Sequence, residues 1–357
     1  MNFDLSEDQY LLQDSVNRLL QKEFSVQKLM QTFDCEGGFD SDLWRQLFDL
    51  GIGTILVPEQ DGGLGLELID AAVVAEILGY HAMPGPYIGQ LLTSYALAQS
   101  GSAEQKSKWL PGLMTGETIA ALAFCEPGNI AQPEQWTLEG GNTLSGVKTH
   151  VIGAHMADLF LVGLAGGELA LVDRTSSGID VELINSADRT RLASTVRFSG
   201  TPGESLGSGA GVTSRIRDAL LILLAADAFG GASRCTEMAL EYAQNREQFG
   251  TAIVNFQAIK HRLVDMSVEV ELTKGLYWYA AHAFDSIPEE SERMAALAKA
   301  HITDCYMQVA RDAVEVHGGI GFTWEYPLQV FFKRAMLDRA YFGDPSKHLD
   351  RYADLAW

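Results

Sequence analysis

The stretch "NREQFGTAIVNFQ", from Asn245 to Gln257, places an arginine, a phenylalanine, a glycine turn and a glutamine between two helical segments. An arginine can donate a forked pair of hydrogen bonds to a phosphate, and a glycine turn exposes backbone N–H groups. The pattern is therefore typical of an anion-binding turn. Taken only as Arg-x-x-Phe-Gly it is a weak signal, because an arginine at a helix C-terminus followed by a glycine is common without any ligand.

A second stretch, "VHGGIGFTWEYP" from Val316 to Pro327, combines glycines with aromatic residues. The glycines allow close approach to the backbone, and the aromatic rings offer flat surfaces. No strand leads into this loop and no βαβ unit surrounds it, so it is not a dinucleotide-binding fingerprint. As an isolated loop it is equally typical of a tight turn between two helices.

Three regions of the chain differ in their sequence pattern. Residues 1–118 are helical, and Ser6 followed by Gln9 predicts a capping box. Residues 119–205 hold short β-prone runs between turn residues, which predicts a compact domain of several antiparallel strands. Residues 206–357 are helical again. Apolar residues recur there at the 3-4 spacing of a helical bundle: Phe256, Ile259, Leu263, Met266 and Val270. We therefore expect a mainly α chain with a middle β domain between an N-terminal helical domain and a C-terminal bundle.

Composition excludes several classes of protein. The 357 residues carry a net charge of −21, which argues against sequence-independent nucleic-acid binding and against attraction to anionic lipid. The most apolar window, Ala219 to Ala232, is too short to span a bilayer, so we expect no membrane insertion. The four cysteines form no metal-binding cluster, and no signal peptide is visible. These features predict a cytoplasmic protein with reduced, mostly buried thiols and no metal site.

Taken together, the two stretches resemble a known family. "REQFGTAIVNFQAIKHRLVDM" followed by "VEVHGGIGFTWEYP" is similar to the acyl-CoA dehydrogenase family. The opening "FDLSEDQYLLQDSVNRLL", the loop "LVPEQDGGLGLELIDAAVVAEILG", the segment "AFCEPG" and "SGVKTHVIGAHMADLFLV" resemble its successive landmarks in the same order. The resemblance extends over essentially the whole chain, and a series of motifs this long is far more specific than any one of them.

The resemblance implies a fold and an activity. The fold is an N-terminal helical domain, a β-barrel-like middle domain and a C-terminal four-helix bundle. The activity is FAD-dependent α,β-dehydrogenation of an acyl-CoA thioester, in which a carboxylate removes the α-proton and the β-hydrogen leaves as hydride to the flavin. An electron-transfer flavoprotein is the expected electron acceptor. Another possibility is that the family fold serves a different flavin reaction, such as oxidation by O₂ or nitroalkane chemistry.

The ending "FGDPSKHLDR" and the shortened β region resemble the smaller-subunit type of the family. Such subunits pair with a related chain to act on bulky, dicarboxylic or steroid-side-chain acyl-CoAs, as in fatty acid or steroid side-chain degradation. The resemblance therefore implies a homo- or hetero-oligomer. It leaves open a second role, that of a catalytically silent partner that completes the FAD site of a related chain.

The resemblance also assigns cofactor-binding residues. One segment matches the family's contact with a partner subunit's FAD, another matches the glycines that lie against the flavin nucleotide, and a strand-end loop matches the neighbourhood of the isoalloxazine ring. The residues so assigned are Arg246, Gln248, Phe249 and Gln257, then Gly318 and Gly319, then Cys125. For Gln257, plain helix packing is the alternative explanation.

The sequence departs from the family near the flavin. After "CEPG" it continues with "NIAQPEQW", which lacks the family's usual small, Ser- and Asp-containing contact stretch. A Trp-x-Thr that normally flanks the flavin is matched by His150, Val151 and Ile152. Glu315 stands where a glutamine is frequent and sets a negative charge near a pyrophosphate. These departures argue against ordinary FAD occupancy in this subunit.

The family's catalytic glutamate has no counterpart. Its position falls on Gly343, with Asp344 one residue later, or on Phe342 if the match is shifted by one. Some members carry the base on the first bundle helix, where this chain has Leu220 or Leu221, with Asp218 close by. Neither placement supplies a glutamate.

Two aspartates are the remaining candidates for a catalytic base. Asp344 precedes a proline, a position that aspartate favours simply because it suits turns. Asp227 lies in an apolar helix, where an unpaired carboxylate would be costly. Its carboxylate is therefore either paired, with Arg246, Lys260 or another base, or has a raised pKa that suits a proton acceptor.

Overall fold

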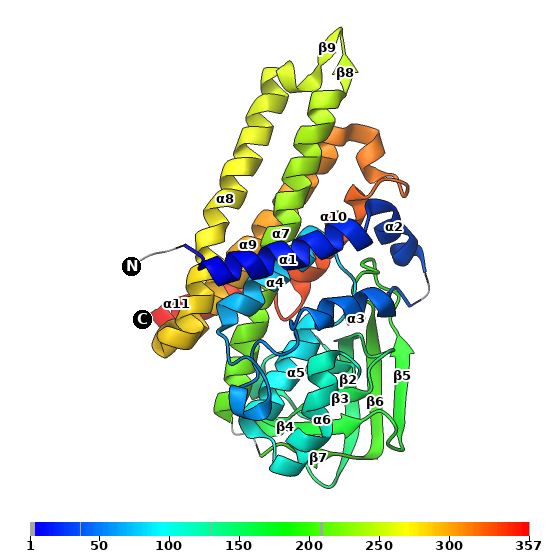
Figure 1. Ribbon diagram of the computed structural model, residues 1–357, viewed down its shortest axis with the longest axis vertical. Coiled ribbons are helices and arrows are strands. Elements are labelled where there is room, and N and C mark those ends of the chain that lie inside the picture. Colours follow the sequence, from blue (N-terminus) through cyan, green and yellow to red (C-terminus); the bar gives the residue numbers. More distant parts are fainter. Residues whose placement is uncertain (1–3, 36, 129, 208–209, 357) are drawn as a thin grey trace. The chain divides into compact units, whose positions relative to one another are not determined.

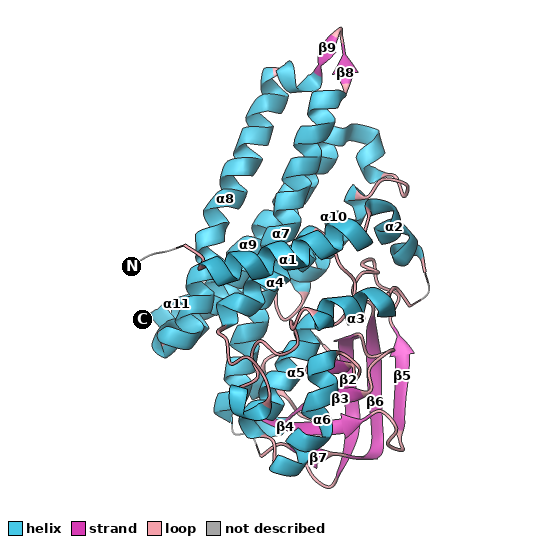
Figure 2. Cartoon of the chain, viewed as in Figure 1, coloured by secondary structure: helices cyan, strands magenta, loops and turns pink. Residues whose placement is uncertain are grey.

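The computed structural model describes residues 4–35, 37–128, 130–207 and 210–356 (Figures 1 and 2). It divides into two compact units. The first, here called the bundle unit, comprises Met1–Asp34, Ala72–Met83 and Leu221–Trp357, and the second, the sheet unit, comprises Cys35–Ala71 and Pro84–Leu220. The expected mainly α fold with a middle β region is confirmed. The domain boundaries at residues 118 and 205 stay a prediction.

Helices make up nearly all of the bundle unit. The Ser6–Gln9 capping box at its first helix is present as predicted, with the Gln9 N–H donating to Ser6 Oγ at 3.2 Å. Two helices, α4 and α7, begin in the sheet unit and continue into the bundle unit. The elements are α1 (Glu7–Glu23), α2 (Val26–Asp34), α4 (Leu68–Tyr80), α7 (Ala210–Asn245), β8 (Glu247–Gln248), β9 (Thr251–Ala252), η4 (Ile253–Asn255), α8 (Gln257–Ser286), α9 (Pro288–His317), η5 (Gly318–Phe322), α10 (Leu328–Ala340) and α11 (Pro345–Ala356).

Close backbone approach holds α4 against α7 in the bundle unit. A Cβ added at Gly79 would lie 2.0 Å from Asp227 O, and one added at Gly230 would lie 1.9 Å from Glu76 O. Each of these helices therefore uses a glycine where the other's backbone passes. Of the face predicted on α8, Leu263, Met266 and Val270 are buried, but Phe256 is exposed. Phe256 is the N-cap residue of α8 and so precedes the helix itself.

The sheet unit carries two sheets. One has the strand order β1-β3-β4-β7 and the other β2-β6-β5. The predicted antiparallel strands are present, and one pairing, β1 with β3, is parallel. The chain leaves β1 for the other sheet before it returns as β3. The elements are α3 (Ser41–Asp49), η1 (Glu59–Asp61), α5 (Tyr87–Ser100), α6 (Ala103–Thr115), β1 (Ala120–Ala123), η2 (Pro133–Gln135), β2 (Thr143–Ile152), β3 (Leu159–Leu164), η3 (Ala165–Gly167), β4 (Glu168–Asp173), β5 (Ile179–Leu183), β6 (Ala193–Pro202) and β7 (Glu204–Ser205).

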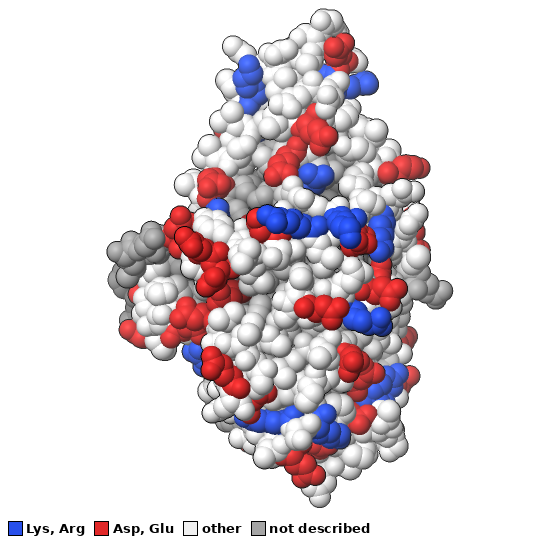
Figure 3. Space-filling view, viewed as in Figure 1, with Lys and Arg blue, Asp and Glu red and all other residues white. Residues whose placement is uncertain are grey.

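Surface charge and helix burial agree with a globular chain. Figure 3 shows acidic and basic side chains interspersed over the face drawn. In the described residues one helix, Gly211–Asn245, is long and apolar enough to cross a membrane by length and composition, but 83% of its most apolar window is buried inside the structure. This burial is what the core helix of a folded domain requires.

Candidate functional site

The arginine segment forms a hairpin at the end of α7. Strands β8 and β9 project beyond α7 and α8 (Figure 1). Phe249 and Gly250 occupy the turn with φ of 53° and 79°, the two positive values that a type I′ hairpin turn requires. The turn holds the Phe249 side chain 94% exposed, with its ring edge-on to Phe256. An aromatic residue at positive φ is unfavourable, so the strained and exposed Phe249 is a candidate for a functional contact.

Arg246 lies at the base of this hairpin. Its backbone N–H donates to Tyr242 O at 2.8 Å, and its carbonyl accepts from the Ile253 N–H at 2.8 Å. These two bonds fix the backbone while the exposed guanidinium pairs with no carboxylate among the residues that the structure describes. Gln248 turns its amide back onto Glu247 O at 2.8 Å, and Gln257 is the exposed first residue of α8. The hairpin thus presents one uncommitted cation.

The glycine loop, residues 318–327, follows α9 directly. Gly318 has φ +64°, and a Cβ added at Gly318 or at Gly319 would find no atom within 4 Å. Both glycines are exposed, and Phe322 nearby is 70% exposed. The protein itself therefore leaves open the space that a side chain would take. This openness fits the close approach of a ligand such as a nucleotide to the backbone.

Glu315 does not place an isolated negative charge beside this loop. Arg262 on α8 lies 3.8 Å from the Glu315 carboxylate and 2.7 Å from that of Asp312. The guanidinium offsets part of the charge that the sequence led us to expect there. The departure from the family's glutamine is therefore smaller electrostatically than it looks in the sequence.

In the sheet unit, Cys125 and Glu126 lead into the loop beyond β1. Cys125 is buried, and burial raises the pKa of its thiol to about 12, so the thiol stays protonated. Burial opposes ionisation of Glu126, but hydrogen bonds from Lys148, Thr137 and Leu138 outweigh it and lower the Glu126 pKa to about 2. The Lys148 Nζ lies 2.8 Å from Glu126 Oε1 and 5.0 Å from the Trp136 ring centroid.

Sequence reasoning missed this buried ion pair. The only signal available was Lys148, a charged residue in a β-prone run, and nothing local identified its partner. The pair locks the loop after Cys125, since Glu126 binds both the Thr137 hydroxyl and the Thr137 and Leu138 backbone. A second tie runs from the Thr149 N–H to Cys125 O at 2.8 Å.

His150 occupies a strained position beside that tie. Its φ is +52°, and the β2–β6 register shifts between Lys148 and Val151, as at a β-bulge. Its side chain is exposed with Nδ1 3.2 Å from Thr149 Oγ1, whereas Val151 points into the core. The bulge thus directs the His150 imidazole outward, at the position that the resemblance matches to a tryptophan.

The turn at Gly343 is filled by the protein itself. Phe342 and Gly343 have φ of +61° and +112°. A Cβ added at Gly343 would lie 3.0 Å from His348 Nε2, which donates to Phe342 O at 3.0 Å. The buried Lys299 Nζ donates to Gly343 O at 3.1 Å. Two side chains therefore hold the carbonyls of this turn, and a side chain at residue 343 would be both strained at φ +112° and crowded by His348.

The two candidate aspartates are both engaged. Asp344 is exposed and caps α11, with Oδ1 accepting the Lys347 N–H at 3.1 Å, and this bond lowers its pKa. Asp227 is buried in a forked pair with Arg334, at 2.6 Å and 3.0 Å. The sequence suggested Arg246 or Lys260 as its partner, but the structure pairs it with another base, which also donates to Met83 O. Catalysis by either aspartate stays a prediction.

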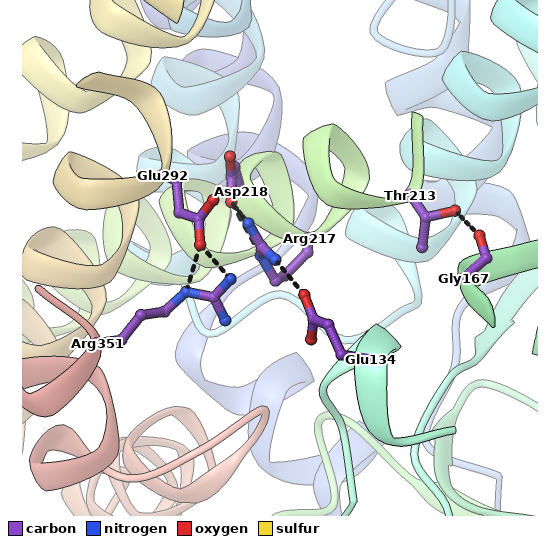
Figure 4. A network of polar contacts seen from close by, with 7 residues as sticks. All are labelled: Glu134, Gly167, Thr213, Arg217, Asp218, Glu292 and Arg351. Carbon is purple, nitrogen blue, oxygen red and sulfur yellow. Dashed lines mark hydrogen bonds and ion pairs between the residues drawn. The ribbon is translucent and has the colours of Figure 1, made fainter. Parts of the chain in front are cut away.

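Asp218, the carboxylate near the alternative base position, is also paired. In the sheet unit Arg217 donates to Asp218 Oδ1 at 3.0 and 2.8 Å and lies 3.3 Å from Glu134 (Figure 4). In the bundle unit, Arg351 of α11 donates its Nε–H to Glu292 at 2.8 Å, also drawn in Figure 4. The Arg217 contact engages the Asp218 carboxylate, and the Arg351–Glu292 contact fixes α11, the helix that follows the Gly343 turn.

Comparison with known proteins covers nearly the whole chain. Residues 6–117 match the family model "Acyl-CoA dehydrogenase, N-terminal domain", and residues 209–354 match "Acyl-CoA dehydrogenase, C-terminal domain". Acyl-CoA dehydrogenase IpdE2 of Mycolicibacterium smegmatis is 32% identical, over 97% of this chain and 98% of the relative.

Two solved structures share the fold and show related sequences. The Tcur3481–Tcur3483 steroid ACAD G363A variant is 29% identical with a TM-score of 0.90, covering 98% of each chain. The ChsE4–ChsE5 complex of Mycobacterium tuberculosis is 26% identical with a TM-score of 0.90, covering 99% of this chain and 98% of the other. With family models at both ends and a relative aligned throughout, the chain belongs to the acyl-CoA dehydrogenase family.

Proposed function

We propose that this chain is one subunit of an FAD-dependent acyl-CoA dehydrogenase, which removes a proton from Cα and a hydride from Cβ of an acyl-CoA thioester. Acyl-CoA dehydrogenases are FAD-binding flavoproteins. The observation that carries the proposal is the joint presence, in the bundle unit, of an uncommitted Arg246 and two glycines with open space above them. Both features suit the pyrophosphate of a nucleotide.

The chain's own residues would bind and orient this cofactor. Arg246 supplies a guanidinium for the pyrophosphate, the Gly318–Gly319 backbone allows close approach, and the exposed Phe249 ring offers a stacking surface. In the sheet unit the Glu126–Lys148 pair keeps the loop after Cys125 rigid. When bound, FAD supplies the redox chemistry by accepting the hydride.

A second role, that of a catalytically silent partner, is favoured by the surroundings of the three residues that could have supplied a catalytic base. A side chain at residue 343 would meet His348 at 3.0 Å in a strained backbone conformation, Asp344 caps a helix and Asp227 is ion-paired. A related chain would then supply the base and this chain would complete its FAD site. Two of the similar structures are a steroid ACAD variant and the ChsE4–ChsE5 complex. We propose that this chain likewise forms a hetero-oligomer, which acts on a bulky acyl-CoA such as a steroid side-chain thioester.

The electron acceptor and the compartment belong to the same proposal. We propose that an electron-transfer flavoprotein takes the electrons and that the enzyme is cytoplasmic. Reduction of a purified electron-transfer flavoprotein by the enzyme tests the first, and fractionation of cells tests the second.

Visible spectroscopy separates the two roles. The chain is purified alone and together with a co-expressed related chain, and each sample is mixed with an acyl-CoA. Flavin bound by the chain alone and bleached by the thioester supports catalysis by this chain. Flavin bound only by the two-chain complex supports the partner role. No flavin in either sample contradicts both.

Asp344→Asn tests the remaining candidate base in whichever sample is active. Asparagine caps helices as well as aspartate, so the change removes the charge and keeps the cap. Asp350→Asn, an exposed residue of the same helix, is the matched control. If Asp344→Asn bleaches flavin as fast as the control, Asp344 is not the base.

A further inference from the structure

Three aromatic rings pack on one another in the bundle unit, close in the chain to Arg246 and to the Gly318–Gly319 turn. The His317 ring stacks on Tyr242, with centroids 4.4 Å apart and planes 27° apart. Tyr326 packs on the same imidazole at 4.9 Å and places its hydroxyl 3.0 Å from His317 Nε2. We call these three residues the ring block. It joins α7, the end of α9 and the far end of the glycine loop.

The hydrogen bonds of His317 fix its tautomer. Its Nδ1 lies 2.7 Å from Ala313 O, and a carbonyl can only accept, so Nδ1 carries the proton. Burial lowers the His317 pKa and so favours the neutral ring. In that form Nε2 accepts, and the Tyr326 hydroxyl donates to it. This hydrogen bond, from the Tyr326 hydroxyl to His317 Nε2, therefore joins the two ends of the glycine loop.

Two of the three residues also adjoin a cofactor segment along the backbone. Tyr242 O accepts the Arg246 N–H at 2.8 Å, so Tyr242 holds the first residue of the hairpin. His317 is the last residue of α9 and immediately precedes Gly318. The two segments are far apart in the sequence, and the Tyr242–His317 stack brings them together.

We propose that the ring block sets the spacing between Arg246 and the Gly318–Gly319 turn, and so positions both for one bound nucleotide. Tyr242, His317 and Tyr326 are positioning residues in this proposal, which rests on the function proposed above. The two segments need such a support because their own contacts are few. Phe249 is 94% exposed, and the open side of the glycines meets no atom within 4 Å. Without a fixed base, binding would have to order both segments and would lose affinity.

The outer side of the loop has a separate anchor. The Trp324 indole N–H donates to Asp34 at 2.8 Å, and Lys333 Nζ lies 3.8 Å from its ring centroid. This anchor ties the loop to α2 and α10 and does not include Arg246 or its hairpin. The ring block differs because it alone, of these two supports, touches both segments.

Conservative substitutions test the ring block on the full chain, with its co-expressed partner if flavin binding requires one. Tyr326→Phe removes only the hydroxyl, and Tyr242→Leu removes the stacked ring. Tyr242→Phe is the matched control because it keeps the ring, and its hydroxyl has no hydrogen-bond partner in the described part of the chain. FAD affinity is measured by quenching of flavin fluorescence at a temperature where circular dichroism shows every variant folded.

We expect Tyr326→Phe to weaken FAD binding roughly 3- to 10-fold, which corresponds to the loss of one hydrogen bond. Tyr242→Leu should weaken it at least as much, and Tyr242→Phe should bind like wild type. The proposal is overturned if Tyr326→Phe and Tyr242→Leu bind FAD with wild-type affinity.

Arg246→Met separates this failure from that of the proposed function. If Arg246→Met weakens FAD binding while the ring variants do not, the cofactor site stands and only the ring block is wrong. If wild type binds no FAD with or without a partner chain, the proposed function falls and the ring-block proposal falls with it. Tyr326→Phe carries the test alone if Tyr242→Leu does not fold.

Discussion

Gly319 and Gly343 both lie in turns that follow a bundle helix, and both fall in segments that the sequence marks as functional. Around Gly319 the protein leaves the space of a side chain open, with no atom within 4 Å of an added Cβ. Around Gly343 the His348 imidazole fills that space to within 3.0 Å, and Lys299 holds the carbonyl. One glycine leaves room for something outside the chain, and the other makes room for the chain itself.

This difference teaches how to interpret a glycine where a family carries a functional residue. A glycine in open space suits close approach by a ligand, whereas a glycine at positive φ against a buried side chain is part of the packing. The second case also agrees with the prediction that residue 343 does not carry the base. A glutamate at residue 343 would need a backbone conformation that side chains avoid and a volume that His348 already occupies.

The largest expected effect contrasts the two turns directly. Gly343→Ala adds a methyl group at φ +112° and against His348, so we expect the free energy of unfolding to fall by about 2–4 kcal/mol. Gly319→Ala should change it by less than about 0.5 kcal/mol. Denaturant unfolding of both variants measures this. Equal losses of unfolding free energy would show that the closed turn at Gly343 and the open turn at Gly319 do not differ in packing.

His348→Ala tests whether the imidazole closes the turn. The change removes a buried ring and its bond to Phe342 O, so we expect a loss of about 1–3 kcal/mol in unfolding free energy. In the double variant with Gly343→Ala the added methyl gains room. In a double-mutant cycle, the loss of unfolding free energy in the double variant should then be smaller than the sum of the two single losses by roughly 1 kcal/mol. Strict additivity would show that His348 does not restrict residue 343.

The closed turn should also give stability a pH dependence. Burial lowers the pKa of the Lys299 ammonium from its ordinary 10.5 to about 7. Between pH 7 and 10.5 the unfolded chain therefore binds more protons at Lys299 than the folded chain, and stability rises with pH in this window. The slope approaches about 1 kcal/mol per pH unit. In Lys299→Met this contribution is absent, and urea unfolding across the window should show a flatter profile. An unchanged slope would mean that Lys299 is not the titrating group.

The smallest effect on stability is expected at the open turn. Gly319→Val places a bulky side chain in space that the protein leaves empty, so the melting temperature should stay within about 2 °C of wild type. FAD affinity should nevertheless fall about tenfold or more, because the side chain occupies the approach to the backbone. Flavin fluorescence titration measures this. A variant that binds FAD normally would place the nucleotide elsewhere.

Much of the fold and part of the site could be predicted from the sequence. The Ser6–Gln9 capping box and the buried positions Leu263, Met266 and Val270 follow from spacing along one helix, and the structure has them. The Arg246 and Gly318 segments were recognisable because each is a short continuous motif. Their proximity was not, since it depends on the stacking of Tyr242 on His317.

The remaining features were decided only by the tertiary structure. Arg334 reaches Asp227, Lys148 reaches Glu126, and His348 fills the space beside Gly343 because the fold brings those side chains together. Helical periodicity and turn chemistry act between neighbours in the chain, so the sequence by itself determined the elements, their order and the family. Which buried carboxylate is neutralised, and which glycine stays open, depends on side chains that meet across the packed interior, and no local pattern encodes that meeting.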